Sequence, residues 1–299
     1  MKIVSLLPSA TEIVFALGLG DALEGVTSDC DHPPGARSKP TVSTTALPLG
    51  ARHSAGTIDQ AVRTRIAAGE PIYRLDAARI SDIAPDLIIT QDLCRVCAVP
   101  TGHVEEALGM LGCHAHVISL DPSTLEDVIA CIELVGDATG TGGRARELTG
   151  RLRDRIGAVR EAVRGLDRPR TFGLEWADPP FTAGHWVPDM IEAAGSTPVL
   201  AVPGMPSRRV RWQEVAWEAP EVMVFMPCGY DLDQAVAESK VLLDVPALAA
   251  TPRTFAADGS AYFSRPGPRV VDGIEALAWA LHPDSAPTPR PEAIQAIRP

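Results

Sequence analysis

The fold of this chain is decided by residues 85–100, which read Pro85-Asp86-Leu87-Ile88-Ile89-Thr90-Gln91-Asp92-Leu93-Cys94-Arg95-Val96-Cys97-Ala98-Val99-Pro100. The first half is a short apolar run, typical of a buried parallel strand, and the second half sets two thiols three residues apart. In an open α/β sheet, ligands bind in the crevice beyond the carboxyl ends of the strands. The stretch therefore predicts a parallel sheet with a functional site at its carboxyl edge.

The composition is that of a globular chain of 299 residues, long enough for two domains. A net charge of −11 argues against a nucleic-acid surface, which needs a concentrated basic face. The sequence contains no apolar run long enough to span a membrane. The first apolar run is broken by turn residues and helical spacing, with no convincing cleavage site, so we expect a cytoplasmic protein with reduced thiols.

Strand and helix patterns alternate on both sides of one long charged helix. Before this helix, strands are predicted at 2–7, 23–27, 86–90 and 116–119, helices at 58–68, 76–83, 105–111 and 124–136, and irregular structure at 35–57. After it, strands are predicted at 172–175, 222–226 and 253–256, and helices at 187–194, 245–249 and 270–281. The helix has one apolar stripe and no proline, so it is not a flexible linker; the stripe is Leu148, Leu152, Ile156, Val159 and Val163.

This pattern predicts an α/β protein of two lobes joined by the helix. The expected boundaries are an N-terminal lobe at 1–141, the connecting helix at 142–166, a C-terminal lobe at 167–282 and a proline-rich tail at 283–299. We expect the tail to be extended and poorly ordered. A cleft between the lobes follows as the expected ligand site, because crevices between domains are preferred for binding.

Loops at the predicted strand ends carry the candidate ligand contacts. Those of the C-terminal lobe are rich in aromatic rings, although aromatic residues make up only 5% of the chain. A planar or bulky apolar ligand held between ring faces would use such a set, whereas any single ring can simply cap the sheet. The candidate contacts are Ser9, Thr11, Trp176, Phe181, His185, Trp186, Tyr230, Tyr262, Phe263 and Arg265.

The cysteines allow a second kind of site. Cys94 and Cys97 have the spacing of a metal hairpin, but one such pair is half a zinc site. Cys30 and Cys228 also follow predicted strands, so the four thiols together could hold zinc or an iron–sulfur cluster. A purely structural role for the thiols is the third possibility.

Motifs of catalysis and of nucleotide binding are absent from the sequence. It has no glycine-rich phosphate loop, no Gly-x-Ser-x-Gly elbow and no His-Glu-x-x-His. We therefore predict no catalytic residue and expect a binding protein more than an enzyme.

Three segments resemble the cobalamin- and siderophore-binding proteins of ABC importers. They are Lys2-Ile3-Val4-Ser5-Leu6-Leu7-Pro8-Ser9-Ala10-Thr11-Glu12, Asp178-Pro179-Pro180-Phe181-Thr182-Ala183-Gly184 and Ala261-Tyr262-Phe263-Ser264-Arg265-Pro266-Gly267-Pro268-Arg269. The resemblance covers about residues 2–282 and is nearest to the cobalamin-binding branch. It implies two Rossmann-like lobes on one rigid helix, the helical-backbone form of periplasmic binding proteins. It also implies a corrinoid or related metal chelate held in a shallow cleft between the lobes.

Three departures from the family pattern bear on the partner and the ligand. Importer proteins resemble one another in carrying a glutamate on each lobe that docks onto permease arginines. Here Glu214 falls at the second-lobe position, whereas Ala78 occupies the first-lobe position, which weakens the expectation of ABC permease docking. The chain also begins directly on the first strand, similar to a branch without a secretion signal, and the four cysteines are not part of the importer pattern.

Two hypotheses follow. In the first, the chain is a non-catalytic receptor for a corrinoid or related metal chelate, acting in the cytoplasm as a carrier or sensor. In the second, it is a cytoplasmic metalloprotein that holds zinc or an iron–sulfur cluster on Cys30, Cys94, Cys97 and Cys228.

Overall fold

The computed structural model describes residues 1–47, 55–68, 70, 72–93, 101–102, 104, 108–109, 114–249, 251–286 and 291–298. The chain divides into two compact units. The first unit comprises Met1–Asp121 and Ala130–Thr149, and the second comprises Pro122–Ile129 and Gly150–Pro299.

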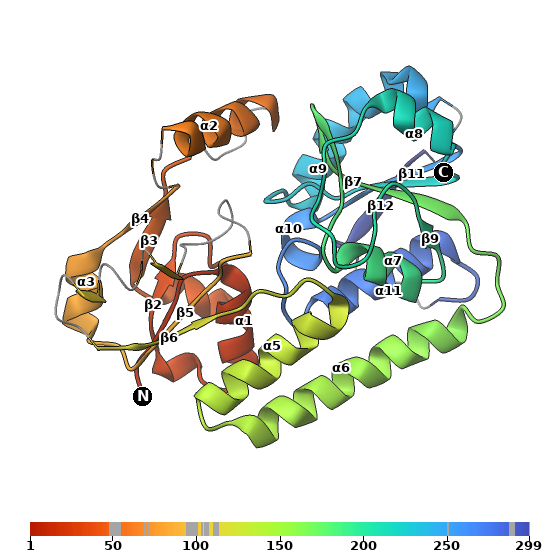
Figure 1. The fold of residues 1–299 in the computed structure, drawn as a ribbon. Helices are drawn as coiled ribbons and strands as arrows, with labels where there is room; N and C mark the ends of the chain where they lie inside the picture. Colours follow the sequence, from red (N-terminus) through yellow and green to blue (C-terminus); the bar gives the residue numbers. More distant parts are fainter. Residues whose placement is uncertain are drawn as a thin grey trace. The chain divides into compact units, whose positions relative to one another are not determined.

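The first unit is built on a six-stranded sheet of order β4-β3-β2-β1-β5-β6 (Figure 1). Its strands are β1 (Ile3–Ser5), β2 (Leu23–Thr27), β3 (Thr41–Thr45), β4 (Tyr73–Leu75), β5 (Leu87–Thr90) and β6 (His116–Ser119). All neighbours are parallel except β3 and β4. Its helices are α1 (Pro8–Ala16), α2 (Ala55–Ala67) and α3 (Ala77–Ile83), with short 3-10 turns at Gly20–Ala22 and Pro34–Ser38. The strand that opens the decisive stretch is therefore a central one, paired with β1 and β6 as its all-buried pattern requires.

One face of this sheet packs on α3 through a cluster that includes Val4, Val42, Ile80 and Ile88. Gly25 in β2 lets the helix approach, because a Cβ there would lie 2.8 Å from Val42 Cγ1 and 3.1 Å from Ile83 Cδ1. The missing side chain therefore sets how closely helix and sheet pack in this unit.

The second unit contains a sheet of order β12-β11-β10-β7-β8, with β9 paired to the start of β7 (Figure 1). Its strands are β7 (Arg170–Ala177), β8 (Pro180–Thr182), β9 (Thr197–Pro198), β10 (Val222–Phe225), β11 (Arg253–Ala257) and β12 (Ile294–Arg298). Its helices are α7 (Val187–Ala193), α8 (Trp212–Glu218), α9 (Leu232–Ser239), α10 (Gly259–Tyr262) and α11 (Val270–Leu281), with 3-10 turns at Lys240–Asp244 and Pro246–Leu248. The strands β8 and β12 run antiparallel to their neighbours at the two edges, and the strands between them are parallel.

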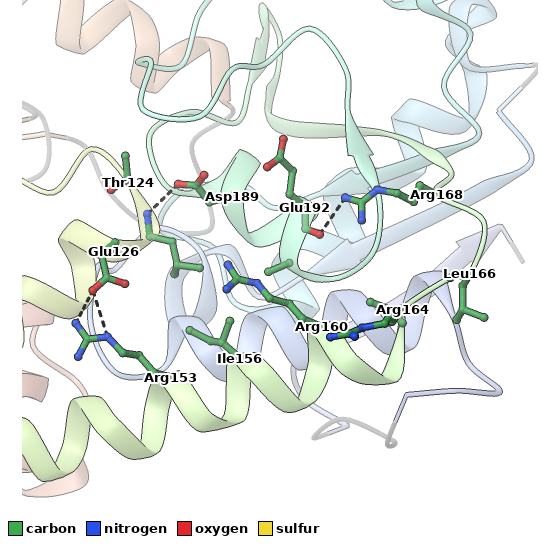
Figure 2. A pocket seen from close by; sticks show the side chains of 14 residues that line it. Thr124, Glu126, Arg153, Ile156, Arg160, Arg164, Leu166, Arg168, Asp189 and Glu192 are labelled. Carbon is green, nitrogen blue, oxygen red and sulfur yellow. Dashed lines mark hydrogen bonds and ion pairs between the residues drawn. The ribbon is translucent and has the colours of Figure 1, made fainter.

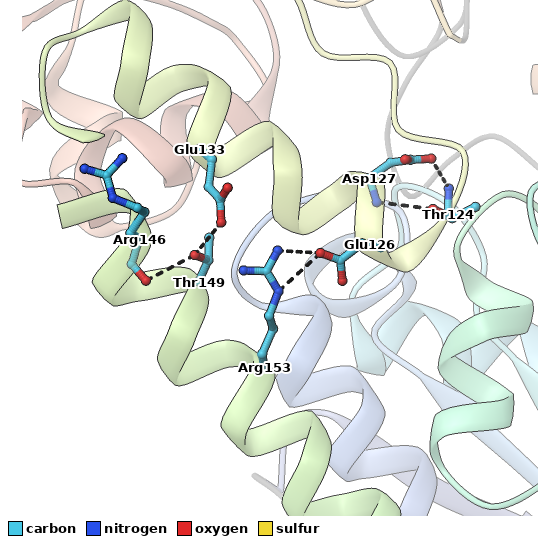
Figure 3. Close-up of polar contacts among 7 residues, drawn as sticks. All are labelled: Thr124, Glu126, Asp127, Glu133, Arg146, Thr149 and Arg153. Atoms are coloured by element: carbon cyan, nitrogen blue, oxygen red, sulfur yellow. Dashed lines mark hydrogen bonds and ion pairs between the residues drawn. The ribbon is translucent and has the colours of Figure 1, made fainter. Parts of the chain in front are cut away.

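Two antiparallel helices, α5 (Leu125–Ala138) and α6 (Gly142–Ala162), each contribute residues to both units. Within the first unit, Gly136 permits a close crossing, because its Cβ would lie 2.4 Å from that of Ala145. In the same unit the Thr149 hydroxyl donates to Glu133 Oε1 over 2.7 Å (Figure 3). The predicted apolar stripe is buried at Leu152, Ile156, Val159 and Val163, as one buried helix face requires.

The start of α5 lies in the second unit and is capped by its own side chains. Asp127 Oδ2 accepts from the backbone N–H groups of Thr124 and Ser123 over 2.8 and 3.1 Å, and Thr124 Oγ1 accepts from the Asp127 N–H over 3.2 Å (Figure 3). This is a reciprocal capping box, which satisfies amides that a helix N-terminus leaves unpaired. In the same first turn, Glu126 forms an ion pair with Arg153 of α6.

Two expectations from the sequence are wrong in this part of the structure. Residues 35–57 are not irregular throughout, because Thr41–Thr45 forms β3 and pairs with β2, which buries Val42 and Ser43. The tail at 283–299 is extended in part but not poorly ordered, because Ile294–Arg298 forms β12 and pairs antiparallel with β11. Both strands are short and are defined by their pairing, β3 between β2 and β4 and β12 at the edge beside β11, so the local pattern does not reveal them. The predicted helix at 105–111 lies mostly outside the described residues, where only 108 and 109 are described.

Among the helices that the structure describes, none is both long enough and apolar enough to cross a membrane.

Candidate functional site

In the first unit, Ser9 and Thr11 lie on α1, just beyond the carboxyl end of β1, and both are buried. The Thr11 hydroxyl lies 2.9 Å from Ser5 Oγ and 3.0 Å from Cys30 Sγ. Ser5 Oγ in turn donates to the carbonyl of Leu7. These hydrogen bonds connect β1, α1 and the loop after β2, so Thr11 stabilises the packing at this end of the sheet. The role of Thr11 as a ligand contact stays a prediction.

The predicted thiol site is only partly visible. Cys94 and Cys97 lie outside the described residues, Cys30 is buried in the first unit, and Cys228 is half-buried in the second. Within the described ranges, no group of three or more His, Cys, Asp or Glu side chains is arranged to hold a metal ion. The zinc or iron–sulfur hypothesis therefore stays a prediction.

In the second unit, three half-buried rings form a row at the carboxyl end of the sheet, which we call the aromatic row: Tyr230, Trp176 and Phe181. Trp176 near the end of β7 is the register partner of Phe181 in β8. The ring of Tyr230, in the loop after β10, meets the edge of the Trp176 ring at a centroid distance of 6.1 Å and an interplanar angle of 76°. Pro180 and Thr182 on either side of Phe181 are buried, so Phe181 points to the opposite face of β8. The row thus presents ring surface where a parallel sheet binds ligands.

Burial raises the pKa of the Tyr230 hydroxyl, and the nearby Glu238 carboxylate raises it further. The hydroxyl is therefore protonated at neutral pH and can donate a hydrogen bond as well as accept one.

His185, in the loop between β8 and α7, has a strained backbone conformation. Its φ is +53°, in the left-handed region that side chains with a Cβ rarely adopt. The backbone there is held by hydrogen bonds to the loop around Met205, whose carbonyl accepts from the His185 N–H over 2.6 Å. Neighbouring Gly184 allows this loop to approach, since a Cβ would lie 2.1 Å from the Ser207 nitrogen. Strain of this kind at a loop is often found at functional sites.

The imidazole of His185 stacks on Trp186, with ring centroids 5.8 Å apart and planes at 27°. Its Nδ1 is buried and has no hydrogen-bond partner among the described residues. Burial lowers the pKa of the ring, so His185 is neutral at pH 7. A neutral imidazole has one N–H donor and one acceptor nitrogen, but no charge.

Three of the predicted contacts pack beneath the surface. Trp186 donates its indole N–H to the Phe263 carbonyl over 2.8 Å, and Trp186, Tyr262 and Phe263 are all buried. Arg269 lies over the Tyr262 ring, with its Cζ 5.6 Å from the ring centroid. These buried rings stabilise the loops that carry them. Contact of the three rings with a ligand, and contact of Arg265 with a ligand, stay predictions.

A separate groove of about 740 Å³ lies in the helical layer of the second unit (Figure 2). Its floor is apolar, with Ile156 of α6 and Val163 just after that helix, and its rim is charged. Arg168 donates to the carbonyl oxygens of Glu192 and Ser196, which closes the end of α7. The groove shares no residue with the predicted ligand contacts, so it is separate from the strand-end face that carries the aromatic row.

Sequence reasoning missed one residue beside the aromatic row. Arg209 forms an antiparallel bridge with Phe181 of β8, a segment that the sequence pattern places in a loop. The available signal was the alternation Arg209-Val210-Arg211, in which Val210 is buried and both arginines are exposed. Such alternation is typical of an extended segment at a sheet edge.

The family described as periplasmic binding protein matches residues 3–256. The chain belongs to the periplasmic binding protein family. A member named vitamin B12-binding protein, from Yersinia pestis, is 22% identical over 295 residues, which cover 98% of this chain and 89% of that protein.

Solved periplasmic binding proteins share the fold. The vitamin B12 binding protein BtuF of Vibrio cholerae has a TM-score of 0.67 at 22% identity, covering 94% of this chain and 96% of its own. The heme-binding protein RhuT of Roseiflexus has a TM-score of 0.70 at 24% identity, covering 94% and 98%. These similarities confirm the predicted two-lobed α/β class with a helical backbone.

The two family positions considered for permease docking lie on exposed or half-exposed helix starts. Glu214 is in the first turn of α8, where it accepts from the backbone N–H and Nε of Arg211 over 2.9 and 3.1 Å. These hydrogen bonds lower the pKa of its carboxyl group. Ala78 is exposed in α3. Glu214 is thus already engaged by Arg211 in this member of the periplasmic binding protein family.

Proposed function

We propose that this protein binds a corrinoid or a related planar metal chelate, and that binding is its whole activity. Membership of the periplasmic binding protein family supports the first part, together with relatives whose names refer to vitamin B12 and heme. The observation that carries the proposal is the aromatic row, which offers half-exposed ring surface at the carboxyl end of a sheet. Flat conjugated ligands bind well to such surfaces, because ring contacts add specific geometry to apolar burial.

The test is retention of a coloured ligand. Purified protein is incubated with dicyanocobinamide, cyanocobalamin or hemin and passed through a gel-filtration column, and absorbance is read in the protein peak. We expect stoichiometric retention of at least one of these compounds. Loss of all three at high protein concentration would overturn the proposal.

Variants show whether the aromatic row is responsible. Trp176→Ala and Tyr230→Ala should weaken binding by at least tenfold, since a buried aromatic contact contributes about 1–3 kcal/mol. Trp217→Ala is the matched control, because Trp217 is 89% exposed on α8 and outside the row. Equal loss in Trp176→Ala and Trp217→Ala would place the binding surface elsewhere.

We further infer a role as carrier or sensor in the cytoplasm. The support is the state of Glu214, whose carboxylate is engaged by Arg211, and the presence of Ala78 where a second docking carboxylate was expected. Fractionation of cells that express the protein from its native gene tests the location. Recovery outside the cytoplasmic fraction, or co-purification with an ABC permease, would refute this role.

A further inference from the structure

Arg209 and Phe181 face each other across a closely spaced strand pair. The Thr182 N–H donates to the Arg208 carbonyl over 3.0 Å, and the Val210 N–H donates to the Pro180 carbonyl over 2.9 Å. These two bonds bracket the Phe181–Arg209 bridge, which makes it a non-hydrogen-bonded antiparallel pair. In such pairs the side chains lie on the same face and nearer to each other than in hydrogen-bonded pairs.

Arg209 therefore extends the aromatic row at its outer end. The order along the face is Tyr230, Trp176, Phe181 and Arg209, from the loop after β10 across β7 and β8. With neighbouring strands about 4.8 Å apart, the row and its arginine span roughly 15 Å. A flat ligand lying on the rings would thus meet a guanidinium at one edge.

The electrostatics of this face differ between its two ends. At the Tyr230 end, the Glu238 carboxylate is near enough to act on the hydroxyl. At the other end, no carboxylate lies within ion-pair distance of Arg209 among the described residues, in a protein with a net charge of −11. The arginines beside it on the same segment are engaged, because Arg208 and Arg211 both form ion pairs with Glu214.

An exposed arginine at a sheet edge can serve solubility alone. Two observations favour a binding role here. Arg209 is on the ring-bearing face of β8, and it lacks the carboxylate partner that each of its neighbours has. Asp178, in the turn between β7 and β8, is exposed and close in sequence to the row, but it forms no ion pair with Arg209 in the described part of the chain.

We propose that Arg209 is a specificity-determining residue that selects ligands with a carboxylate at the rim of the flat macrocycle. The inference rests on the proposed function and refines its substrate class from metal chelates in general to carboxylate-bearing ones. A guanidinium matches a carboxylate in shape and charge, and the charge-assisted bond is stronger than one to an amide. The acidic Tyr230 end orients the ligand with its anionic edge toward Arg209.

A matched ligand pair tests this proposal. Dicyanocobyrinic acid and dicyanocobinamide share one corrin ring, but the first carries carboxylates where the second carries amides. Affinities are measured by absorbance titration for the wild type, for Arg209→Gln, and for Arg208→Gln as control. Arg208 is the adjacent residue on the same segment and points to the opposite face, so its variant makes the same charge change at the wrong place.

We expect the wild type to prefer the carboxylate form, and Arg209→Gln to lose roughly tenfold or more for that form, the size of one charge-assisted hydrogen bond. Its affinity for the amide form should stay within about twofold, and Arg208→Gln should resemble the wild type for both. Added salt should weaken only the carboxylate form, because screening acts on charge pairs. Thermal unfolding of both variants at the wild-type temperature shows that the fold is intact.

Three outcomes would overturn the inference. Equal wild-type affinity for both corrinoids, unchanged in Arg209→Gln, would remove the selectivity while leaving the proposed function in place. Equal losses in Arg208→Gln and Arg209→Gln would indicate a diffuse field and no direct contact. Failure of the wild type to bind either corrinoid or hemin would refute the proposed function itself.

Discussion

Replacing Trp186 with Phe removes one buried hydrogen bond between the loop of His185 and that of Phe263, and keeps a ring in place. The indole N–H donates to the Phe263 carbonyl over 2.8 Å, with Trp186 6% and Phe263 1% exposed. A buried acceptor that loses its donor costs about 1–3 kcal/mol, and the smaller ring leaves a void worth about 1 kcal/mol. We expect the free energy of unfolding to fall by about 2–4 kcal/mol.

Urea denaturation followed by circular dichroism measures this change as a lower midpoint at constant slope. Trp217→Phe is the control, because its ring is 89% exposed and the substitution should cost less than about 0.5 kcal/mol. Trp186→Phe should also weaken ligand binding, since the bond ties the loop of His185 to that of Phe263. Indistinguishable midpoints for the two Trp variants would refute the assignment of Trp186 as the link between these loops.

Three further predictions follow from single contacts. His185→Asn should make the free energy of unfolding less dependent on pH between 7 and 5. Burial lowers the pKa of His185 in the folded state, so protonation of the unfolded state below about pH 6.5 destabilises the wild type, whereas asparagine tolerates the positive φ and does not titrate. Equal loss of stability by both proteins in thermal melts across this range would contradict the reasoning. Arg155→Met should lower the free energy of unfolding by about 1–2 kcal/mol, because Arg155 forms ion pairs with Asp272 and Glu275 over 2.6 and 2.7 Å. This loss is smaller than that of breaking a fully buried pair, because the Arg155 side chain is 39% exposed. A thermal melt that is unchanged in low salt would count against it. Asp127→Ala should lower the free energy of unfolding by about 1 kcal/mol, because it removes the α5 cap, and Asp127→Asn should lower it less. Denaturant midpoints measure both changes, and equal effects would argue against a charge contribution at this helix start.

Much of the element order was predictable from the sequence, because it depends on local period and turn chemistry. The strand at 23–27, the strand at 116–119 and the helix at 270–281 have the predicted bounds. The apolar stripe of the long charged helix is buried as predicted at Leu152 and Ile156. Each of these segments carries its pattern over its own length, so no distant partner is needed to define it.

The failures share one physical cause, which is that pairing with another segment defines these strands. The strand β12 forms only because β11, some forty residues earlier, offers an open edge. Likewise β8 has three residues and no alternation long enough to recognise, and it is defined by its pairing with β7 and the bridge to Arg209. Hydrogen bonds between the paired segments decide such elements, and local propensity does not.

The candidate site divides in the same way. The sequence by itself determined that aromatic residues gather at the strand ends of the second unit, because turn signals and apolar runs place those loops. Only the tertiary structure decided which rings are half-exposed, as Trp176 is, and which are buried supports, as Phe263 is. It also brought Arg209 opposite Phe181, across a gap in sequence that no local pattern spans. The physical reason is that burial and cross-strand contact are properties of pairs of segments, and these exist only once the sheet has formed.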